Sequence, residues 1–249
     1  MSVNSVTTAL RVFEEVAAAQ PAGLSDLARR LDTPKSTVQR CLKTLEAAGW
    51  VRAAPDDSGR WVITGKAFSI GSAVAAGADL RAVAMPILSE LQAQTGETIH
   101  LALPDGDELV LIERLDSPHQ LRAFLPLGTR LPLHAASNGK AYLASLPDNE
   151  IEEVLRRDLD RRTPRTITDP DALREEIAEI RARGYAITEQ ELHDGITAIA
   201  VALRLGRSGR TAASFSISGP SLRITPDLYE DYGRQALEAK TRIERFLGA

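Results

Sequence analysis

Residues 24–63 read LSDLARRLDTPKSTVQRCLKTLEAAGWVRAAPDDSGRWVI, and this stretch decides the fold of the N-terminal part of the chain. Apolar residues recur at the spacing of one helix face in residues 24–31, which predicts a short first helix. A second helix is predicted over residues 34–48, because its apolar residues again fall on one face. Asp32 and Thr33 are expected to cap this second helix with their side-chain oxygens.

The residues after the second helix predict a two-stranded wing. Gly49 suits the left-handed conformation that ends a helix. WVR (residues 50–52) and RWVI (residues 60–63) are typical of strands, and the Pro, Asp, Ser and Gly residues between them are typical of a turn. The order predicts a winged helix-turn-helix, with Arg52 and Arg60 beside the wing, where they can reach a DNA backbone or a narrow minor groove.

The outward face of the predicted second helix is polar and basic. Short hydroxyls, an amide and cations can hydrogen-bond base edges and neutralise phosphates. Ordinary surface helices are also polar, so DNA binding is inferred from this face together with the turn and the wing. We expect Gln39 to read adenine, Arg40 to read guanine, and Lys35, Lys43 and Arg60 to contact phosphates. The predicted DNA contacts are Lys35, Ser36, Thr37, Gln39, Arg40, Lys43 and Arg60.

Length and composition allow two folded domains. The chain has 249 residues, of which 43% are hydrophobic, enough for two cores. Its one cysteine, Cys41, falls on the inward face of the second helix, which excludes a disulfide within the chain and favours a reducing compartment. The sequence has no apolar run of membrane-spanning length and no signal-peptide core at its N-terminus. We therefore expect a cytoplasmic protein without a membrane partner.

The charge is divided unevenly along the chain. The formal net charge is −4, but residues 1–78 hold nine Lys and Arg against seven Asp and Glu, a balance of +2. Residues 79–249 hold 21 basic and 27 acidic residues, a balance of −6. A slightly basic head and an acidic body fit a DNA-binding domain that carries a regulatory domain.

The rest of the chain predicts an α+β fold with a mostly antiparallel sheet, because helices and strands alternate without a continuous parallel repeat. We expect a DNA-binding domain over residues 3–64, a linker helix over 65–78 and a second domain over 79–249. Helices are expected over residues 7–19, 65–77, 79–95 and 170–183, the last with Thr168 and Asp169 as its cap. Further helices are expected to begin at Ser137 and after Pro147, and one more is expected at the C-terminus. The expected strands are residues 98–103, 108–115, 121–125, 196–203 and 211–218.

Two of these helices carry a local expectation. Leu10, Phe13, Val16 and Ala17 are expected to form the buried stripe of the first helix. Pro86 is expected to kink the helix over residues 79–95 or to mark a restart, because proline removes a backbone donor and clashes with the preceding turn.

Head and body together resemble the IclR family of bacterial transcriptional regulators. The resemblance is carried by residues 24–51 and by ETIHLAL (97–103), LPLHAASNGKAYLA (131–144), ITDPDALREEIAEIRARGYAIT (167–188) and SISGP (216–220). It implies a winged-helix head, a linker helix and a GAF-like body that binds a small effector. It also implies a homodimer that often pairs into a tetramer on operator DNA, and an organic or aromatic acid as effector, with repression favoured over activation.

The resemblance further implies an effector pocket at Ser137, Asn138, Gly139, Thr188, Ala198, Ser216 and Ser218. The N-terminus of a helix that begins near Ser137 offers free backbone N–H groups to a carboxylate. Ser216 and Ser218 lie two apart on a strand, so their hydroxyls face the same side. Family members that bind very small keto acids carry a carboxylate where Thr188 stands and a thiol where Ala198 stands, so this chain departs from that pattern.

Enzyme signatures are not found in the sequence. Ser218 lacks the G-x-S-x-G pattern of a nucleophile elbow, and the scattered histidines predict neither a metal site nor catalytic residues. No cofactor is expected. Two alternatives stay open: an enzyme that acts on a small acid, and a winged-helix protein-interaction module without a ligand.

Overall fold

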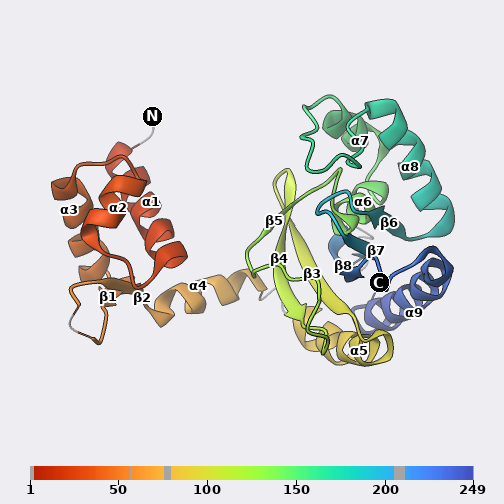
Figure 1. Cartoon of the computed structure of the whole chain (residues 1–249), viewed down its shortest axis with the longest axis horizontal. Coiled ribbons are helices and arrows are strands. Elements are labelled where there is room, and N and C mark those ends of the chain that lie inside the picture. Colours follow the sequence, from red (N-terminus) through yellow and green to blue (C-terminus); the bar gives the residue numbers. More distant parts are fainter. Residues whose placement is uncertain (1–2, 57, 76–79, 205–210, 249) are drawn as a thin grey trace. The chain divides into compact units, whose positions relative to one another are not determined.

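The computed structural model describes residues 3–56, 58–75, 80–204 and 211–248, and its two compact units are residues 1–77 and 78–249 (Figure 1). An N-terminal helix-turn-helix unit and a C-terminal unit of antiparallel sheet and helices match the predicted α+β class. The end of the predicted linker helix (76–78) and the turn expected at residues 206–209 lie outside the described residues.

The N-terminal unit is a winged helix-turn-helix (Figure 1). Its core joins Val12 and Val16 to Leu27 and to Val38 and Leu42, because each helix turns one apolar stripe inward. The two short strands pair antiparallel, with Val51 opposite Ile63. The elements are α1 (Asn4–Ala19), α2 (Leu24–Arg30), α3 (Lys35–Ala47), β1 (Val51–Ala53), β2 (Trp61–Ile63) and α4 (Gly65–Ala75).

Two local predictions in this unit are wrong. Leu10 is 54% exposed and Ala17 is exposed as well, because the buried side of α1 is formed by Ala9, Val12, Phe13 and Val16 instead. The helix α3 is capped by the backbone of Pro34, whose carbonyl accepts from the N–H of Thr37, and not by the side chains of Asp32 and Thr33. Asp32 instead has a φ of 48°, and this left-handed residue makes the turn between α2 and α3.

The C-terminal unit is built on a six-stranded sheet with the order β5-β4-β3-β8-β7-β6, in which all pairs are antiparallel. Its strands are β3 (Thr98–Asp105), β4 (Glu108–Leu115), β5 (Arg130–Pro132), β6 (Ala186–Glu189), β7 (Ile196–Arg204) and β8 (Thr211–Pro220). Its helices are α5 (Leu80–Thr95), α6 (Ser137–Ala144), α7 (Asp148–Leu155), α8 (Pro170–Arg183) and α9 (Tyr229–Phe246), the last preceded by a 3-10 turn over Pro226–Leu228.

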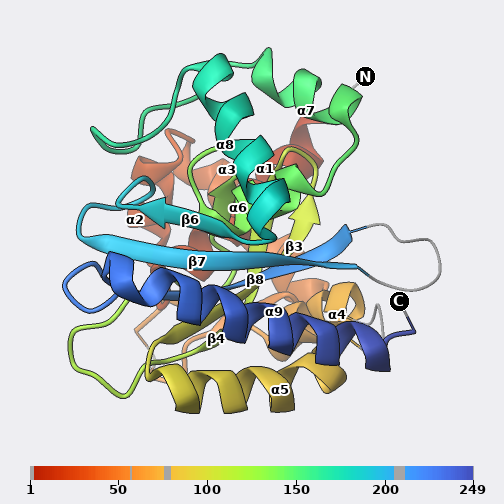
Figure 2. The ribbon, with the colours of Figure 1, turned by 90° about the vertical axis from the view of Figure 1, so that its right-hand side faces the viewer.

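Helices cover both faces of this sheet. Figure 2 shows α5 and α9 along one face and α6, with α7 and α8 beyond it, on the other. The large apolar side chains of β7 and β8, such as Val201 and Phe215, pack under α5 and α9. The alternate residues, Ala198, Ala200 and Ala202 on β7 and Ser214, Ser216 and Ser218 on β8, face the α6 side. Small side chains there let α6 lie close to the sheet.

The strands of the body depart from the predictions at two places. Residues 121–125 form no strand: the carbonyls of Ala123 and Leu125 accept from Thr98 Oγ1 (2.9 Å) and Arg114 Nη1 (2.6 Å) instead of joining a ladder. The short strands β5 and β6 were not predicted, because three or four residues are too few to show a periodicity. The helix α5 runs through Pro86 without a restart. Asp169 caps the N-terminus of α8 as predicted, whereas the Thr168 hydroxyl accepts from Arg161 Nη2 instead; Gly184, in the left-handed conformation, ends the helix.

Among the helices in the described parts of the chain, none has the length and apolar composition needed to cross a bilayer.

Gly139 on α6 provides a test of this close packing. A Cβ on Gly139 would lie 2.6 Å from the Cα of Leu133 and would collide with the backbone carbonyl of Pro132. We expect Gly139→Ala to lower the free energy of unfolding of the body by about 1–3 kcal/mol, because backbone cannot move aside cheaply. Urea unfolding followed by circular dichroism measures the change. Gly71→Ala is the control, since a Cβ at Gly71 meets no atom within 4 Å; equal effects of the two variants would contradict the packing argument.

Candidate functional site

The predicted DNA-contact face of α3 is open to solvent. The side chains of Lys35, Ser36, Gln39 and Arg40 are exposed, and Thr37 is half-buried. The opposite face, which carries Val38, Cys41, Leu42 and Leu45, is buried in the head. The helix therefore presents hydroxyls, an amide and cations outward, and the described residues of the head leave most of this face open.

Lys43 on α3 and Arg60 beside the wing have different surroundings. Lys43 Nζ lies 2.9 Å from Glu46 Oε2 and 5.3 Å from the centre of the Trp61 ring on β2. This cation therefore has partners of its own, whereas Arg60 is exposed beside the wing turn. The two remain candidates for phosphate contacts, with Lys43 exchanging Glu46 for a phosphate.

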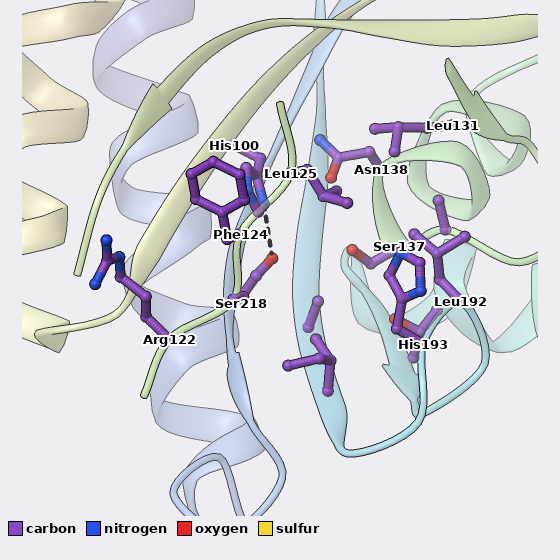
Figure 3. A pocket seen from close by; sticks show the side chains of 15 residues that line it. His100, Arg122, Phe124, Leu125, Leu131, Ser137, Asn138, Leu192, His193 and Ser218 are labelled. Carbon is purple, nitrogen blue, oxygen red and sulfur yellow. Dashed lines mark hydrogen bonds between the residues drawn. The ribbon is translucent and has the colours of Figure 1, made fainter. Parts of the chain in front are cut away.

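A cavity of about 310 Å³ lies in the body beside the N-terminus of α6 (Figure 3). Its walls come from β3, β5, β6, β7 and β8 of the sheet, from α6, and from the loops around residues 122–125 and 192–193. Apolar side chains make up most of the lining, and the polar groups are few. Lining residues include Phe124, Leu125, Leu131, Leu192, Ile196 and Ala198, with His100, Ser137, Asn138, Thr188, His193 and Ser218.

Five of the seven residues expected at the effector pocket line this cavity: Ser137, Asn138, Thr188, Ala198 and Ser218. Gly139 does not line it, because it packs on the backbone of Pro132 and Leu133. Ser216 is buried behind the cavity, where its Oγ lies 3.0 Å from Ser218 Oγ. In this geometry Ser218 lies at the wall, and the Ser216 hydroxyl contacts the Ser218 hydroxyl from behind it.

Buried hydrogen bonds fix the polar groups at the wall. Asn138 Nδ2 donates to Ser214 Oγ at 3.2 Å, which ties α6 to β8. On the sheet, Ser216 Oγ, Ser218 Oγ and His100 Nδ1 form a chain with spacings of 3.0 and 3.3 Å. The dashed line in Figure 3 marks the bond between Ser218 and His100.

The loop over residues 122–125 is held against the cavity by Arg114 on β4. The Arg114 guanidinium stacks 3.9 Å from the centre of the Phe124 ring, and Nη1 donates to the carbonyl of Leu125. Arg114 Nε lies 2.7 Å from Asp116 Oδ1, so its charge is largely paired. This cation positions the loop.

A buried ion pair holds the opposite loop. Lys140 on α6 is fully buried, and its Nζ donates to Glu191 Oε1 at 2.7 Å. Burial raises the pKa of the Glu191 carboxyl, although Lys140 acts against this shift. The Thr166 hydroxyl donates to the Glu191 carbonyl at 2.7 Å. Breaking such a pair leaves an uncompensated charge, at a cost of about 3–5 kcal/mol, so the segment that carries Leu192 and His193 is firmly placed.

Sequence reasoning missed His100 and the two loops. His100 was treated as one of four scattered histidines, although Thr98, His100 and Ala102 alternate on β3 with the apolar residues of the other face. This alternation along the strand is the sequence signal that indicates which face of the sheet the His100 side chain occupies. The loops carried no such signal, since their positions depend on Arg114 and Lys140. Among the described residues, no group of three or more His, Cys, Asp or Glu side chains is placed to hold a metal ion.

Fold and site thus define a winged-helix DNA-binding protein whose second domain contains a ligand-sized cavity. The sequence model for the C-terminal domain of the bacterial transcriptional regulator IclR matches residues 72–245, and that of the IclR helix-turn-helix domain matches residues 5–55. The chain belongs to the IclR family of bacterial transcriptional regulators.

Similar proteins are repressors and regulators of this family. The chain is 39% identical over 226 residues to the HTH-type transcriptional repressor AllR of Klebsiella pneumoniae, covering 90% of this chain and 82% of AllR. It is 33% identical over 245 residues to the transcriptional repressor IclR of Escherichia coli, covering 97% and 89%.

Solved structures share the whole architecture. The Thermotoga maritima IclR structure superposes with a TM-score of 0.83 at 30% identity, covering 99% of each chain. The structure of an IclR homologue from Microbacterium hydrocarbonoxydans in complex with 4-hydroxybenzoate superposes with a TM-score of 0.85 at 28% identity, covering 98% of each chain.

The buried imidazole of His100 makes a pH dependence testable. Burial, assisted by the positive charge of Arg114 and opposed by Asp116, lowers the pKa of His100 from 6.5 to about 4. The unfolded chain therefore binds a proton that the folded chain does not, at pH values between about 4 and 6.5. We expect the free energy of unfolding to fall by about 3 kcal/mol from this group as the pH drops through that window.

Urea unfolding of the wild type and of His100→Gln at several pH values between 7 and 4 measures this contribution. All other titrating groups are common to the two proteins. The difference between their free energies of unfolding at each pH therefore reports the contribution of His100. Parallel curves for the two proteins would show that the folded chain does not keep His100 neutral.

Proposed function

We propose that this chain is a repressor whose affinity for operator DNA changes when a small organic or aromatic acid occupies the cavity beside α6. The observation that carries the proposal is a largely apolar cavity with a few buried polar groups, in the same chain as an exposed recognition helix. A gel shift with the DNA upstream of the neighbouring genes, in the presence and absence of acids selected by a thermal-shift screen, tests it. A ligand at a hundredfold its Kd adds about 2.7 kcal/mol to the stability, which such a screen detects.

The DNA side of the proposal assigns roles to the exposed face of α3. Gln39 and Arg40 read bases in the major groove, because amide and guanidinium groups match the edges of adenine and guanine. Ser36 and Thr37 add contacts at the start of the helix. Lys35, Lys43 and Arg60 contact phosphates.

In the proposed function, the acid binds between the sheet and α6. The unpaired N–H groups at the start of α6, around Ser137 and Asn138, favour a carboxylate. Phe124, Leu131 and Leu192 provide apolar walls that suit an aromatic or branched body. The complex of the Microbacterium homologue with 4-hydroxybenzoate supports this size and class of ligand.

We further propose that the protein acts in the cytoplasm as a homodimer or a dimer of dimers. Exposed apolar side chains of the head support an interface between copies: Val3, Val6 and Leu10 at α1, and Phe68 and Ile70 on α4. Two heads related by a two-fold axis place their recognition helices about 34 Å apart, one turn of the DNA helix. The acid needs to favour one arrangement of the dimer by only about 1–3 kcal/mol to change operator affinity about 5- to 150-fold.

Catalysis is not part of the proposal. Ser218 and His100 lie in hydrogen-bond contact as a nucleophile and its base would. The pKa of His100, lowered by burial to about 4, makes it a weak base at neutral pH. His100 Nε2 also lacks the hydrogen-bonded orienting group of a triad, since no partner for it is found in the described part of the chain. A regulator returns its ligand unchanged, which a turnover assay measures.

Arg40→Ala tests base reading by α3. We expect operator binding to weaken by about 1–3 kcal/mol and binding to scrambled DNA to weaken less, because a bidentate guanine contact is lost along with a charge. Fluorescence anisotropy with both DNAs at one salt concentration gives the two affinities. Arg156→Ala, an exposed arginine of the body, is the control. Equal losses on the two DNAs would remove Arg40 from the base-reading role.

Ser218→Ala tests the cavity. We expect the acid found in the screen to bind about tenfold more weakly, because a hydrogen bond at a charged ligand is worth about 1.5–3 kcal/mol, while operator affinity without the acid is unchanged. Calorimetric titration and the gel shift measure the two quantities. Ser89→Ala, an exposed serine on α5, serves as the control. Undiminished response to the acid in Ser218→Ala would place the ligand elsewhere.

A further inference from the structure

The imidazole of His100 is buried in the cavity wall with one ring nitrogen unused. The residue is 3% exposed, and its Nδ1 lies 3.3 Å from Ser218 Oγ. Its Nε2 is buried and has no hydrogen-bond partner in the described part of the chain. Buried polar atoms are nearly always hydrogen-bonded, and His100 is a residue of the cavity wall, so a ligand in the cavity is a candidate partner for its Nε2.

The strand register explains how His100 reaches the cavity. On β3 it lies opposite Ser216 of β8 on one side and opposite Arg114 of β4 on the other, and it projects to the α6 face of the sheet. In Figure 3 its ring and the Ser218 side chain lie together at the sheet side of the cavity, with Phe124 beside them. A ligand in the cavity therefore meets His100 before it meets Ser216.

Burial, assisted by the positive charge of Arg114, keeps His100 neutral, and two of the described cations beside the cavity are each paired with a carboxylate. The Arg114 guanidinium faces it from β4 and is paired with Asp116, and Lys140 on α6 is paired with Glu191. Among the lining residues Arg122 also carries a charge, but its side chain extends away from the other labelled side chains in Figure 3. Its Nε lies 3.9 Å from Asp116 Oδ1. The site thus suits one negative charge held by neutral donors.

We propose that His100 is an effector-binding residue that donates its Nε2–H to an oxygen of a bound monocarboxylate. The hydroxyls behind it set the tautomer: Ser216 donates to Ser218, Ser218 donates to His100 Nδ1, and Nε2 then carries the proton. Hydrogen bonds in such a chain strengthen one another. We expect dicarboxylates to be excluded, because the described cations Arg114 and Lys140 are already paired and Arg122, the charged residue of the lining, extends away from the other labelled side chains. This inference rests on the proposed effector function and assigns the residue that selects the effector class.

Two substitutions at His100 separate its nitrogens. Asn places a polar atom where Nδ1 stands and keeps the contact with Ser218, but has nothing at the Nε2 position. Gln places a donor where Nε2 stands. Calorimetric titration of the full chain with benzoate, 4-hydroxybenzoate, pyruvate and the dicarboxylate terephthalate compares wild type, His100→Asn and His100→Gln. The exposed His119→Asn is the control.

We expect at least one monocarboxylate to bind the wild type, and His100→Asn to weaken it about tenfold or more, the size of a lost hydrogen bond to a charged group. His100→Gln and His119→Asn are expected to stay within about threefold of the wild type on the same scale. Terephthalate is expected not to bind. Equal losses in His100→Asn and His100→Gln, or no loss in either, would show that His100 is structural; binding of terephthalate as tight as that of benzoate would overturn the single-charge argument.

Nitrogen-15 spectra of the wild type with labelled histidine provide a second readout that does not depend on a folded variant. The proposal requires the Nε2–H tautomer at His100 and a shift of that N–H resonance when the acid is added. An Nδ1–H tautomer in the complex would contradict the donor role. If none of the four acids binds the wild type or changes its affinity for DNA, the proposed effector function fails together with the role of His100. If an acid releases DNA but leaves the His100 resonance unmoved, only the role of His100 fails.

Discussion

The close approach of α6 to the sheet is the constraint on which the rest of the body depends. Strand residues alternate between faces, so β7 and β8 place large apolar side chains under α5 and α9 and only alanines and serines under α6. Gly139 removes the last Cβ from the contact with Leu133. The helix can then bring its N-terminal N–H groups to the sheet, and the cavity forms where α6 begins.

Half of the small residues that β7 and β8 place under α6 are serines, and their hydroxyls are polar groups in a buried position. Three buried serines on one strand face need partners, and they find them in Asn138 and in each other, with His100 at the end of the chain. A fully apolar set of small residues would have allowed the same helix approach. Serine hydroxyls add directed hydrogen bonds instead, and in a wall of low polarity such bonds orient a ligand as well as the protein.

Some elements of the fold and of the cavity can be predicted from the sequence, and others cannot. The helix-turn-helix, the wing, β3, β4, β7, β8 and α8 follow from periodicity and from caps such as Asp169, because those signals are local. The resemblance supplied five residues that line the cavity. The prediction of a strand over residues 121–125 is wrong, since nothing local reveals that the carbonyls of this loop accept hydrogen bonds from Thr98 and Arg114. The contribution of His100 needed the register of β3 against β8, which is a tertiary property.

The two kinds of wall differ in how they can respond to a ligand. The sheet side is fixed by the ladders between β3, β8 and β7, and α6 is fixed by its packing. The loop that carries Phe124 is held by side-chain bonds from Arg114 and Thr98, and the loop that carries Leu192 by Lys140 and threonine hydroxyls. Fewer bonds have to change for a loop to move than for a strand. In the proposed function, a ligand whose carboxylate binds at the rigid wall acts on the loops through its apolar body. Under that proposal its polar group determines affinity and its shape determines the response.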